Sequence, residues 1–263
     1  MAWKENGYTA ITGASAGIGY ETAKAFARRG SNLILIARRK DRLEDLRKEL
    51  CAFDSKLDIV ILVCDLSVVQ NVFKLYESVR AYPLKTWINN AGFGDYDSVW
   101  EQDLDKAGRM LRLNVESLTA LSSLFARDFK DTQGAQLINV SSCGGYTIVP
   151  NAVTYCATKF YVSAFTEGLA WELDAAHAKM RAKVFAPAAT KTEFGMVAND
   201  VSAYDYDKAF GAYHTSEQMA AFLLELYDSD KTVGFVDRED LSFHLCGPRF
   251  SYAGNSGHNQ KIG

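Results

Sequence analysis

The sequence has few of the residues from which disulfide frameworks and metal sites are built. Its 263 residues include five cysteines and four histidines. The cysteines are odd in number and none forms a Cys-x-x-Cys pair, so neither a disulfide framework nor a zinc site is predicted. The histidines are scattered along the chain, and we expect no metal ion. Unpaired cysteines are typical of a reducing compartment, which favours a cytoplasmic protein.

Long apolar runs and an excess of one charge are also missing. No stretch approaches the roughly 20 apolar residues of a membrane-spanning helix. Lys4 and Glu5 leave no room for the apolar region of a signal peptide before Gly13. The 29 basic and 32 acidic residues leave a formal net charge of −3, without the broad basic surface that nucleic acid requires. We therefore expect a soluble protein that binds neither membranes nor nucleic acid.

The hydrophobic content is high and regularly distributed. At 48% hydrophobic residues, the chain is too apolar to remain disordered, and its length suits one large domain. Short apolar runs alternate with segments of helical period, and the runs LILIA and IVILVC lack polar alternation, as is typical of strands buried on both faces. The predicted strands span residues 8–12, 32–37, 58–64, 86–89, 135–141, 181–186 and 232–236.

Helix boundaries are signalled between these strands. Asp41 with Glu44, and Thr215 with Gln218, have the spacing of capping boxes, and Gly30 lies where a glycine commonly ends a helix. A long helix is predicted over residues 151–176. No linker or internal repeat interrupts the alternation, so we expect a single domain over residues 1–263. Its predicted fold class is α/β, a single Rossmann-like doubly wound parallel sheet with helices on both faces.

A glycine-rich turn, TGASAGIG, follows the first predicted strand and opens a helix. In that context the glycines permit a tight turn and close approach of a pyrophosphate to the helix N-terminus. The spacing differs from the general G-x-G-x-x-G fingerprint, and an isolated turn of this kind could be a plain loop. The predicted cofactor contacts here are Gly13, Ser15, Ala16, Gly17, Ile18 and Gly19.

The residues after the second predicted strand indicate which dinucleotide is bound. A site for NAD(H) carries an acidic residue there, whereas this chain has Arg38, Arg39 and Lys40. Guanidinium groups match a 2′-phosphate, so NADP(H) is favoured. Alternatively, the basic residues are a solvated helix start opposed by Asp41. Asp65, after the third strand, could bind the adenine amino group or cap the next helix.

Four polar residues form a candidate catalytic set. Tyr155 and Lys159 are four residues apart on one helical face, and Ser142 ends a strand where open α/β sheets place their ligand crevice. Asn114 interrupts the apolar helical stretch MLRLNVESL. Each has another interpretation: an exposed Tyr–Lys pair, a serine in a turn, and an asparagine that bonds backbone in the core.

With these motifs in this order, the chain resembles the short-chain dehydrogenase/reductase family, in its compact branch. The resemblance covers about residues 5–236 and rests on TGASAGIG, NNAG, Asn114, the serine pair ending at Ser142, and YCATK. It implies that Tyr155 is the general acid/base and that Lys159 binds the nicotinamide ribose and lowers the tyrosine pKa. Ser142 would orient the substrate oxygen, and Asn114 would hold a water in a proton relay.

The resemblance also implies further cofactor contacts and one departure from the pattern. These contacts are Asp65, Leu66, Asn90, Ala91, Gly92, Tyr155, Lys159, Pro187, Thr190 and Thr192. The NNAG segment would mainly stabilise the central sheet. Ala188 follows Pro187 where the family usually has glycine, and a left-handed backbone there would cost about 1 kcal/mol or more.

Two segments and the assembly are predicted from the same family pattern. Residues 193–214 should form a mobile substrate lid without a regular pattern, whose aromatic residues either line a pocket or pack as in any loop. Residues 247–263 are polar and glycine-rich, which suggests a flexible end or an intersubunit contact. A homodimer or homotetramer through two long helices, around residues 104–130 and 151–176, is expected.

The predicted function is that of an NADP(H)-dependent oxidoreductase that interconverts a carbonyl and a secondary alcohol of a small molecule. One alternative is a specialist for 3-hydroxy acids or 3-oxoacyl thioesters. Another is a non-catalytic, NADP(H)-sensing regulator, which the complete set of Asn114, Ser142, Tyr155 and Lys159 disfavours.

Overall fold

The central element of the protein is an eight-stranded sheet, seen in a computed structural model that describes residues 7–254 and 256. Its strand order is β10-β9-β6-β5-β4-β1-β2-β3, and all neighbours are parallel except β10, which pairs antiparallel with β9. The strands are β1 (Tyr8–Thr12), β2 (Asn32–Ala37), β3 (Ile59–Val63), β4 (Leu84–Asn89), β5 (Gln136–Val140), β6 (Arg181–Ala186), β9 (Val233–Val236) and β10 (Phe243–Cys246).

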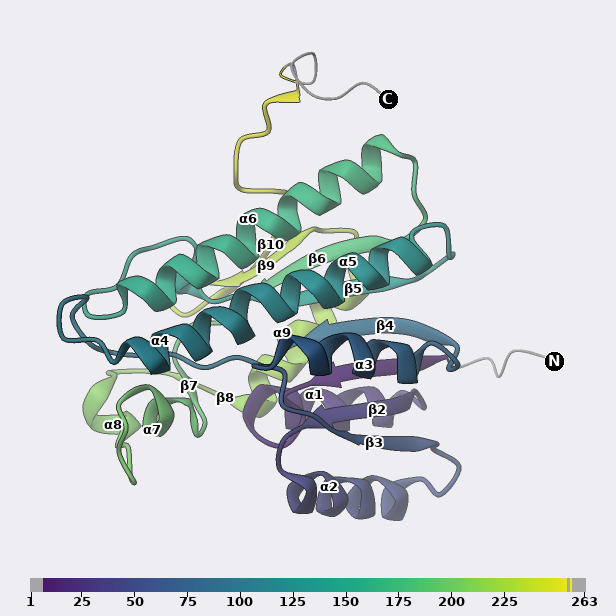
Figure 1. Ribbon diagram of the computed structural model, residues 1–263, viewed down its shortest axis with the longest axis horizontal. Helices are drawn as coiled ribbons and strands as arrows, with labels where there is room; N and C mark the ends of the chain where they lie inside the picture. The colour runs from purple at the N-terminus through teal and green to yellow at the C-terminus, as the bar shows by residue number, and fades with distance from the viewer. Residues whose placement is uncertain (1–6, 255, 257–263) are drawn as a thin grey trace.

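Helices cover both faces of this sheet (Figure 1). One face packs against α1 (Gly17–Arg28), α2 (Lys40–Phe53) and α9 (Ser216–Asp228), through a buried core that includes Phe26, Leu46 and Leu223. The other face packs against α3 (Val69–Val79), α5 (Leu118–Phe129) and α6 (Val153–Ala175) through a second core. The doubly wound α/β sheet predicted from the sequence is therefore confirmed.

The predicted strands are all present, with ends that differ by at most two residues. The sequence did not predict β10, nor the short parallel pair of β7 (Thr190–Lys191) and β8 (His214–Thr215). In β10 each residue is half-buried or exposed, so the apolar run that marks the inner strands is missing. Two-residue strands have no period to detect, and only tertiary contact makes them pair.

Helix ends follow the predicted signals in two cases and depart from them in a third. Thr215 and Gln218 form a reciprocal capping box at the start of α9. Gly30 adopts a φ of +75° and donates its N–H to Ala27 after α1. The predicted box at Asp41 is wrong: the N-cap of α2 is Arg39, two residues earlier, and it has no side-chain cap. Asp41 therefore lies inside the first turn.

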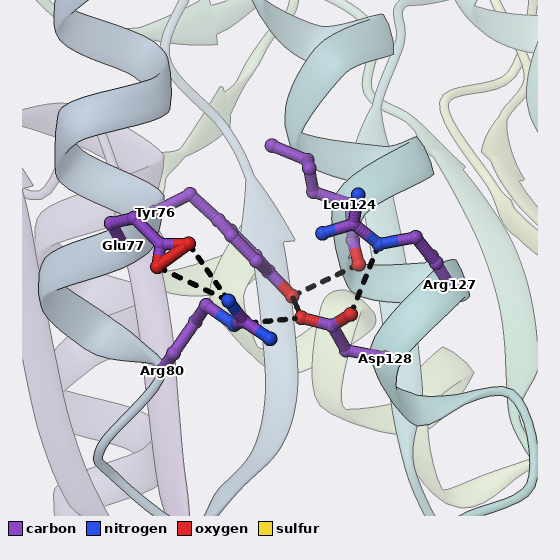
Figure 2. Close-up of polar contacts among 6 residues, drawn as sticks. All are labelled: Tyr76, Glu77, Arg80, Leu124, Arg127 and Asp128. Carbon is purple, nitrogen blue, oxygen red and sulfur yellow. Dashed lines mark hydrogen bonds and ion pairs between the residues drawn. The ribbon is translucent and has the colours of Figure 1, made fainter.

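A polar network fastens α3 to α5 at the edge of the second core (Figure 2). The Tyr76 hydroxyl donates to the Leu124 carbonyl at 3.0 Å and to Asp128 at 3.1 Å. Arg80 lies 3.2 Å from the same Asp128 carboxylate. The Tyr76 ring packs beside fully buried Trp87 of β4, so the network fixes both helices to the strand that leads to the site.

The first part of the C-terminal tail is held in place, contrary to the expectation of a flexible end. The buried carboxylate of Glu167, in α6, accepts the backbone N–H groups of Arg249 and Phe250 at 2.6 and 2.8 Å and the Tyr146 hydroxyl at 2.5 Å. The Phe250 ring stacks on Tyr146 at 5.4 Å. The rest of the predicted tail, residue 255 and residues 257–263, lies outside the described residues.

The sheet topology determines where a ligand crevice forms. The chain order along the sheet reverses between β1 and β4, which places an opening at the carboxyl ends of these neighbouring strands. Below it, the Asn89 side chain donates to Ser122 and Asn139 at 3.1 and 2.9 Å and accepts from Trp87 Nε1. These bonds satisfy buried polar groups in the sheet. Within the described residues, no helix is long and apolar enough to cross a membrane.

Candidate active site

The turn after β1 has the backbone geometry of an anion cradle. Gly13 and Gly17 adopt φ values of +69° and +56°, which L side chains rarely tolerate. A Cβ on Gly17 would lie 3.0 Å from Thr192 Cγ2, so glycine lets the turn and the segment after β7 approach each other. The N-cap of α1, Ala16, offers no side-chain acceptor. The first N–H groups of α1 are therefore available to phosphate oxygens.

The NNAG segment also supports this turn from the neighbouring strand, a contact that the sequence did not predict. The Thr12 hydroxyl accepts the backbone N–H groups of Asn90 and Ala91 at 3.0 and 2.9 Å. Asn90 Nδ2 in turn donates to the Thr12 carbonyl at 3.0 Å. A Cβ on Gly19 would lie 2.4 Å from Asn90 Nδ2, so Gly19 serves the packing of α1.

Ser142, Tyr155 and Lys159 meet at the carboxyl end of β5. Lys159 Nζ donates to the Val140 carbonyl at 2.9 Å and lies 5.9 Å from the centre of the Tyr155 ring. The Ser142 hydroxyl accepts the Gly144 N–H at 3.1 Å, which fixes the short helical turn that follows it. The exposed-pair alternative is excluded, since Tyr155 and Lys159 are only 8% and 6% exposed.

Burial determines the protonation of this pair. Burial raises the pKa of Tyr155 above its ordinary value of 10, and a hydrogen bond with Ser142 opposes this rise. Burial also lowers the pKa of Lys159 to about 8. The resemblance implied that Lys159 lowers the pKa of Tyr155. The protein groups instead raise this pKa, because loss of hydration disfavours the phenolate. The raised pKa favours the neutral, protonated hydroxyl of Tyr155.

Asn114 lies beside Lys159, since a Cβ on Gly92 would be 3.0 Å from Asn114 Oδ1 and 3.5 Å from Lys159 Nζ. It belongs to a π-helical turn, Arg112–Ser117, between α4 (Leu104–Leu111) and α5. Its Nδ2 donates to the Phe93 carbonyl at 2.9 Å and to Thr158 Oγ1 at 3.1 Å, while its Oδ1 accepts the Phe93 N–H at 3.2 Å. The side chain thus bonds backbone, as one alternative held, and the water relay stays a prediction.

A cavity of about 680 Å³ joins the turn to the catalytic residues. All predicted cofactor residues line it except Gly19, and Ser142 lines it as well, whereas Asn114 does not. A Cβ on Gly92 would lie 3.5 Å from Lys159 Nζ, so glycine keeps room beside the ammonium group. Ala188 also lines the cavity. Its backbone is not left-handed, so alanine causes no backbone strain at the position where the family usually has glycine.

The two arginines and Asp65 have different surroundings at the far end of the cavity. Arg39 bonds Ser15 and Glu193, and its side chain is 46% exposed. Asp65 Oδ1 accepts the backbone N–H and the hydroxyl of Ser67 at 2.9 and 2.7 Å, in a turn before α3. The capping alternative is wrong, because the N-cap of α3 is Val68, without a side-chain acceptor. Asp65 and Arg38 still line the cavity, so a cofactor contact remains open to both.

Aromatic rings form the other end of the cavity. Phe194 lies 5.4 Å from Tyr155 and 6.2 Å from Tyr96, measured between ring centres. A Cβ on Gly94 would lie 2.6 Å from the Phe194 ring, so this glycine makes room for it. The lid aromatics that line the cavity are Phe194, Tyr204, Tyr206 and Phe210. The pocket alternative is favoured for these residues.

The lid is more regular than expected and is fastened to the domain. It contains α7 (Phe194–Ala198) and α8 (Tyr206–Ala209), and the pairing of β7 with β8 joins its two ends. The Tyr96 N–H donates to the Ala198 carbonyl at 3.0 Å. Lys106 lies 2.8 Å from buried Asp95 and 2.5 Å from Asp200 of the lid. Short helices with irregular caps carry little signal in a sequence, which is why this segment resembled a loop.

Several lining residues were missed by sequence reasoning. Tyr96 and Lys106 come from the loop after β4 and from α4, and neither belongs to a motif. The one feature of the sequence that could have indicated them is that they follow NNAG. The chain after this motif starts at the carboxyl end of β4, where the cavity lies. Among the described residues, no three histidine, cysteine, aspartate or glutamate side chains gather as metal ligands.

Comparison with known proteins decides the family. A family model described as short chain dehydrogenase matches residues 8–202. The chain belongs to this family. Dehydrogenase/reductase SDR family member 11 of Homo sapiens is 31% identical over 218 residues, which cover 80% of each chain. The short-chain dehydrogenase is thus an oxidoreductase by family.

Two further matches place it among characterised members. Sulfoacetaldehyde reductase 2 of Chromohalobacter salexigens is 34% identical over 191 residues, 71% of this chain and 74% of the relative. A short-chain dehydrogenase from Sphingobium yanoikuyae, solved in complex with NADPH, is 28% identical with a TM-score of 0.78 and covers 86% of both chains. The short-chain dehydrogenase therefore shares both sequence and fold with family oxidoreductases.

Proposed function

We propose that this short-chain dehydrogenase is an NADP(H)-dependent oxidoreductase that interconverts a carbonyl and a secondary alcohol. The observation that carries the proposal is a single cavity, lined at one end by the glycine turn and two arginines and at the other by Ser142, Tyr155 and Lys159. A bound dinucleotide would reach from one end of this cavity to the other, with its nicotinamide beside the hydroxyl groups of Ser142 and Tyr155.

The residues present fit a nicotinamide dinucleotide. The uncapped N–H groups at the start of α1 would bind the pyrophosphate, and Lys159, with Gly92 leaving room beside it, would hold the nicotinamide ribose. Arg38 and Arg39 would bind a 2′-phosphate. The NADPH complex of the Sphingobium relative supports this choice. When bound, the nicotinamide supplies or accepts the hydride.

The chain's own contribution is proton delivery and orientation. In the reductive direction, the neutral Tyr155 hydroxyl donates its proton to the carbonyl oxygen as hydride reaches the carbon. Ser142, held by the Gly144 N–H, orients that oxygen. The rings of Tyr96 and Phe194 exclude water and favour an apolar or aromatic substituent on the substrate.

Equilibrium binding and a turnover panel test the proposal. Quenching of NADPH fluorescence should give a dissociation constant far below that for NADH, and equal constants would contradict the arginine argument. A panel of aryl ketones, aldehydes, a carrier-linked 3-oxoacyl thioester and a free 3-hydroxy acid, followed by the absorbance of the reduced cofactor, identifies the substrate class. Tight binding without turnover on the whole panel would instead favour the regulator alternative.

A further inference from the structure

An ion pair ties the start of the lid to the rim of the dinucleotide cleft. Arg39 Nη1 donates to Glu193 Oε2 at 2.6 Å. The Nε and Nη2 atoms of Arg39 donate to the Ser15 hydroxyl at 3.3 and 3.2 Å. Arg42 lies 3.6 Å from the other Glu193 oxygen. One guanidinium thus connects the glycine turn after β1 with the residue directly before α7.

This contact involves a group that the proposed function needs elsewhere. Building on the proposed NADP(H) function, we propose that Glu193 competes with the cofactor 2′-phosphate for Arg39, so that a 2′-phosphorylated dinucleotide releases the start of the lid and NAD(H) does not. Glu193 would then be a specificity-determining and coupling residue.

The competition follows from charge. Arg39 donates to Glu193 through Nη1 alone, and a phosphate monoester carries a charge of about −1.5 to −2 against −1 for a carboxylate, so the phosphate is the stronger ligand for the guanidinium. If Glu193 stayed in place, its carboxylate would repel the phosphate. A ribose 2′-hydroxyl has no charge with which to displace it. The Arg39 side chain is 46% exposed and that of Glu193 33%, so replacement of the carboxylate by a phosphate needs little desolvation.

Release at Glu193 has a direct consequence for the catalytic end. The next residue, Phe194, packs its ring 5.4 Å from that of Tyr155 and covers the hydroxyl side of the cavity. The end of α7 remains attached through the Ala198 carbonyl and the adjacent Asp200, and the β7–β8 pairing holds the chain before Glu193. Loss of the Arg39 contact therefore loosens the short segment between these two attachments and lets the Phe194 ring move aside for a carbonyl substrate.

Adenosine probes separate this coupling from cofactor preference. Adenosine 2′,5′-bisphosphate and adenosine 5′-monophosphate carry only the adenosine half and cannot touch the lid at the nicotinamide end. Amide hydrogen exchange of residues 194–198 is measured with each probe at saturation. We expect the bisphosphate to raise exchange there several-fold and the monophosphate to leave it unchanged.

Two variants complete the test. In Glu193→Gln, exchange of residues 194–198 should already be fast, the bisphosphate should add nothing, and the NADPH dissociation constant should fall about three- to fivefold with less than a twofold change for NADH. Glu44→Gln is the matched control. Glu44 pairs with Arg47 at 2.5 Å, and the exposures of the two side chains are similar, 44% for the arginine and 28% for the glutamate. Unlike Glu193, Glu44 does not line the cavity.

The outcomes distinguish the two proposals. If the bisphosphate binds more tightly than the monophosphate but leaves exchange unchanged in the unmodified protein, the coupling role of Glu193 is wrong and the cofactor preference holds. If both probes bind equally, the preference for NADP(H) is wrong and the coupling role falls with it. An equal response of Glu44→Gln and Glu193→Gln would also overturn the coupling role, since surface charge alone would then explain the effect.

Discussion

At the scale of single residues, the proposed chemistry depends on a hydroxyl and an ammonium group that share a buried environment. Tyr155 and Lys159 lie on one face of α6, and both are almost fully buried against β5 and the lid. Burial keeps the hydroxyl protonated and makes the ammonium group titratable near pH 8. Under the proposed function, carbonyl reduction would therefore begin with the proton already on Tyr155.

Tyr155→Phe removes that proton donor while keeping the ring. We expect kcat for carbonyl reduction to fall about 10²- to 10⁴-fold, because the alkoxide must then take its proton from elsewhere. NADPH binding, followed by fluorescence, should change little. Tyr161→Phe, on an exposed part of the same helix, is the control and should keep full activity. A Tyr155→Phe variant that turns over at the original rate would exclude this residue as the acid.

The pKa of Lys159 predicts a pH dependence. Below pH 8 the group is an ammonium ion in the free enzyme, and as pH rises through about 8 it loses its proton. The raised pKa of Tyr155 keeps the hydroxyl protonated through this range. Steady-state assays from pH 6 to 9.5 should thus show kcat/KM for reduction falling on the alkaline side of about 8. Lys159→Met should have low activity without that break, and the same break in the variant would assign it to another group.

At the scale of elements, a helix position depends on local capping and on what the helix covers. The Thr215 hydroxyl accepts the Gln218 N–H at 3.2 Å, and the Gln218 side chain accepts the Thr215 N–H at 2.8 Å. Behind this box, Met219 and Leu223 are fully buried against the first core. The sequence signal was reliable here because both partners lie within four residues.

Thr215→Ala leaves the first turn of α9 without its side-chain acceptor. We expect a loss of about 1 kcal/mol in the free energy of unfolding, equivalent to a fall of about 2 °C in Tm for a domain of this size. Chemical denaturation and a thermal scan measure both quantities. Thr215→Ser keeps the hydroxyl and should retain most of the stability; an equal loss in both variants would show that the methyl group, and not the cap, matters.

At the scale of the whole molecule, a contact between distant segments holds residues 249–250 against α6. Glu167 accepts N–H groups from residues that are 82 and 83 positions away. Its other oxygen accepts the Tyr146 hydroxyl, four residues beyond Ser142. The tail and the loop that carries the serine therefore share one buried carboxylate.

Glu167→Gln replaces an acceptor by a group that also donates. The amide oxygen can still accept the two backbone N–H groups while the amide nitrogen donates to the Tyr146 hydroxyl, but the negative charge that strengthens these bonds is lost. We expect the segment around Arg249 to detach more often, since a hydrogen bond to a charged group contributes about 1.5–3 kcal/mol and a neutral one about 0.5–1.5 kcal/mol. Trypsin should then cleave after Arg249 at least tenfold faster, as measured by mass spectrometry of the fragment ending there. Glu172→Gln, exposed on the same helix, is the control and should not change the rate.

The assembly is also a property of the whole molecule, and we propose a homodimer or homotetramer. Tyr161 and Trp171 of α6 remain more than a third exposed, and both stack on other rings at the surface, Tyr161 on Phe165 and Trp171 on Tyr252. Burial of such rings favours association. Light scattering at micromolar concentration should give a mass of two or four chains. A mass of one chain would contradict the proposal.

The sequence by itself determined what is encoded locally. Strand positions followed from apolar runs, and the box at Thr215 and the glycine after α1 followed from short-range chemistry. The order TGASAGIG, NNAG, Ser142 and YCATK was sufficient to predict the family. The predicted box at Asp41 failed because capping depends on where the turn before the helix leaves the strand, and that is decided by packing.

Only the tertiary structure decided which side chains meet across the chain and what burial does to them. The Asn114 bonds to Phe93, the pairing of Glu193 with Arg39 and the hold of Glu167 on the tail join residues far apart in sequence. The raised pKa of Tyr155 likewise depends on the hydration removed by α6, β5 and the lid together. Motifs record residue types at fixed spacings, whereas contact partners and desolvation exist only when the elements are packed in space.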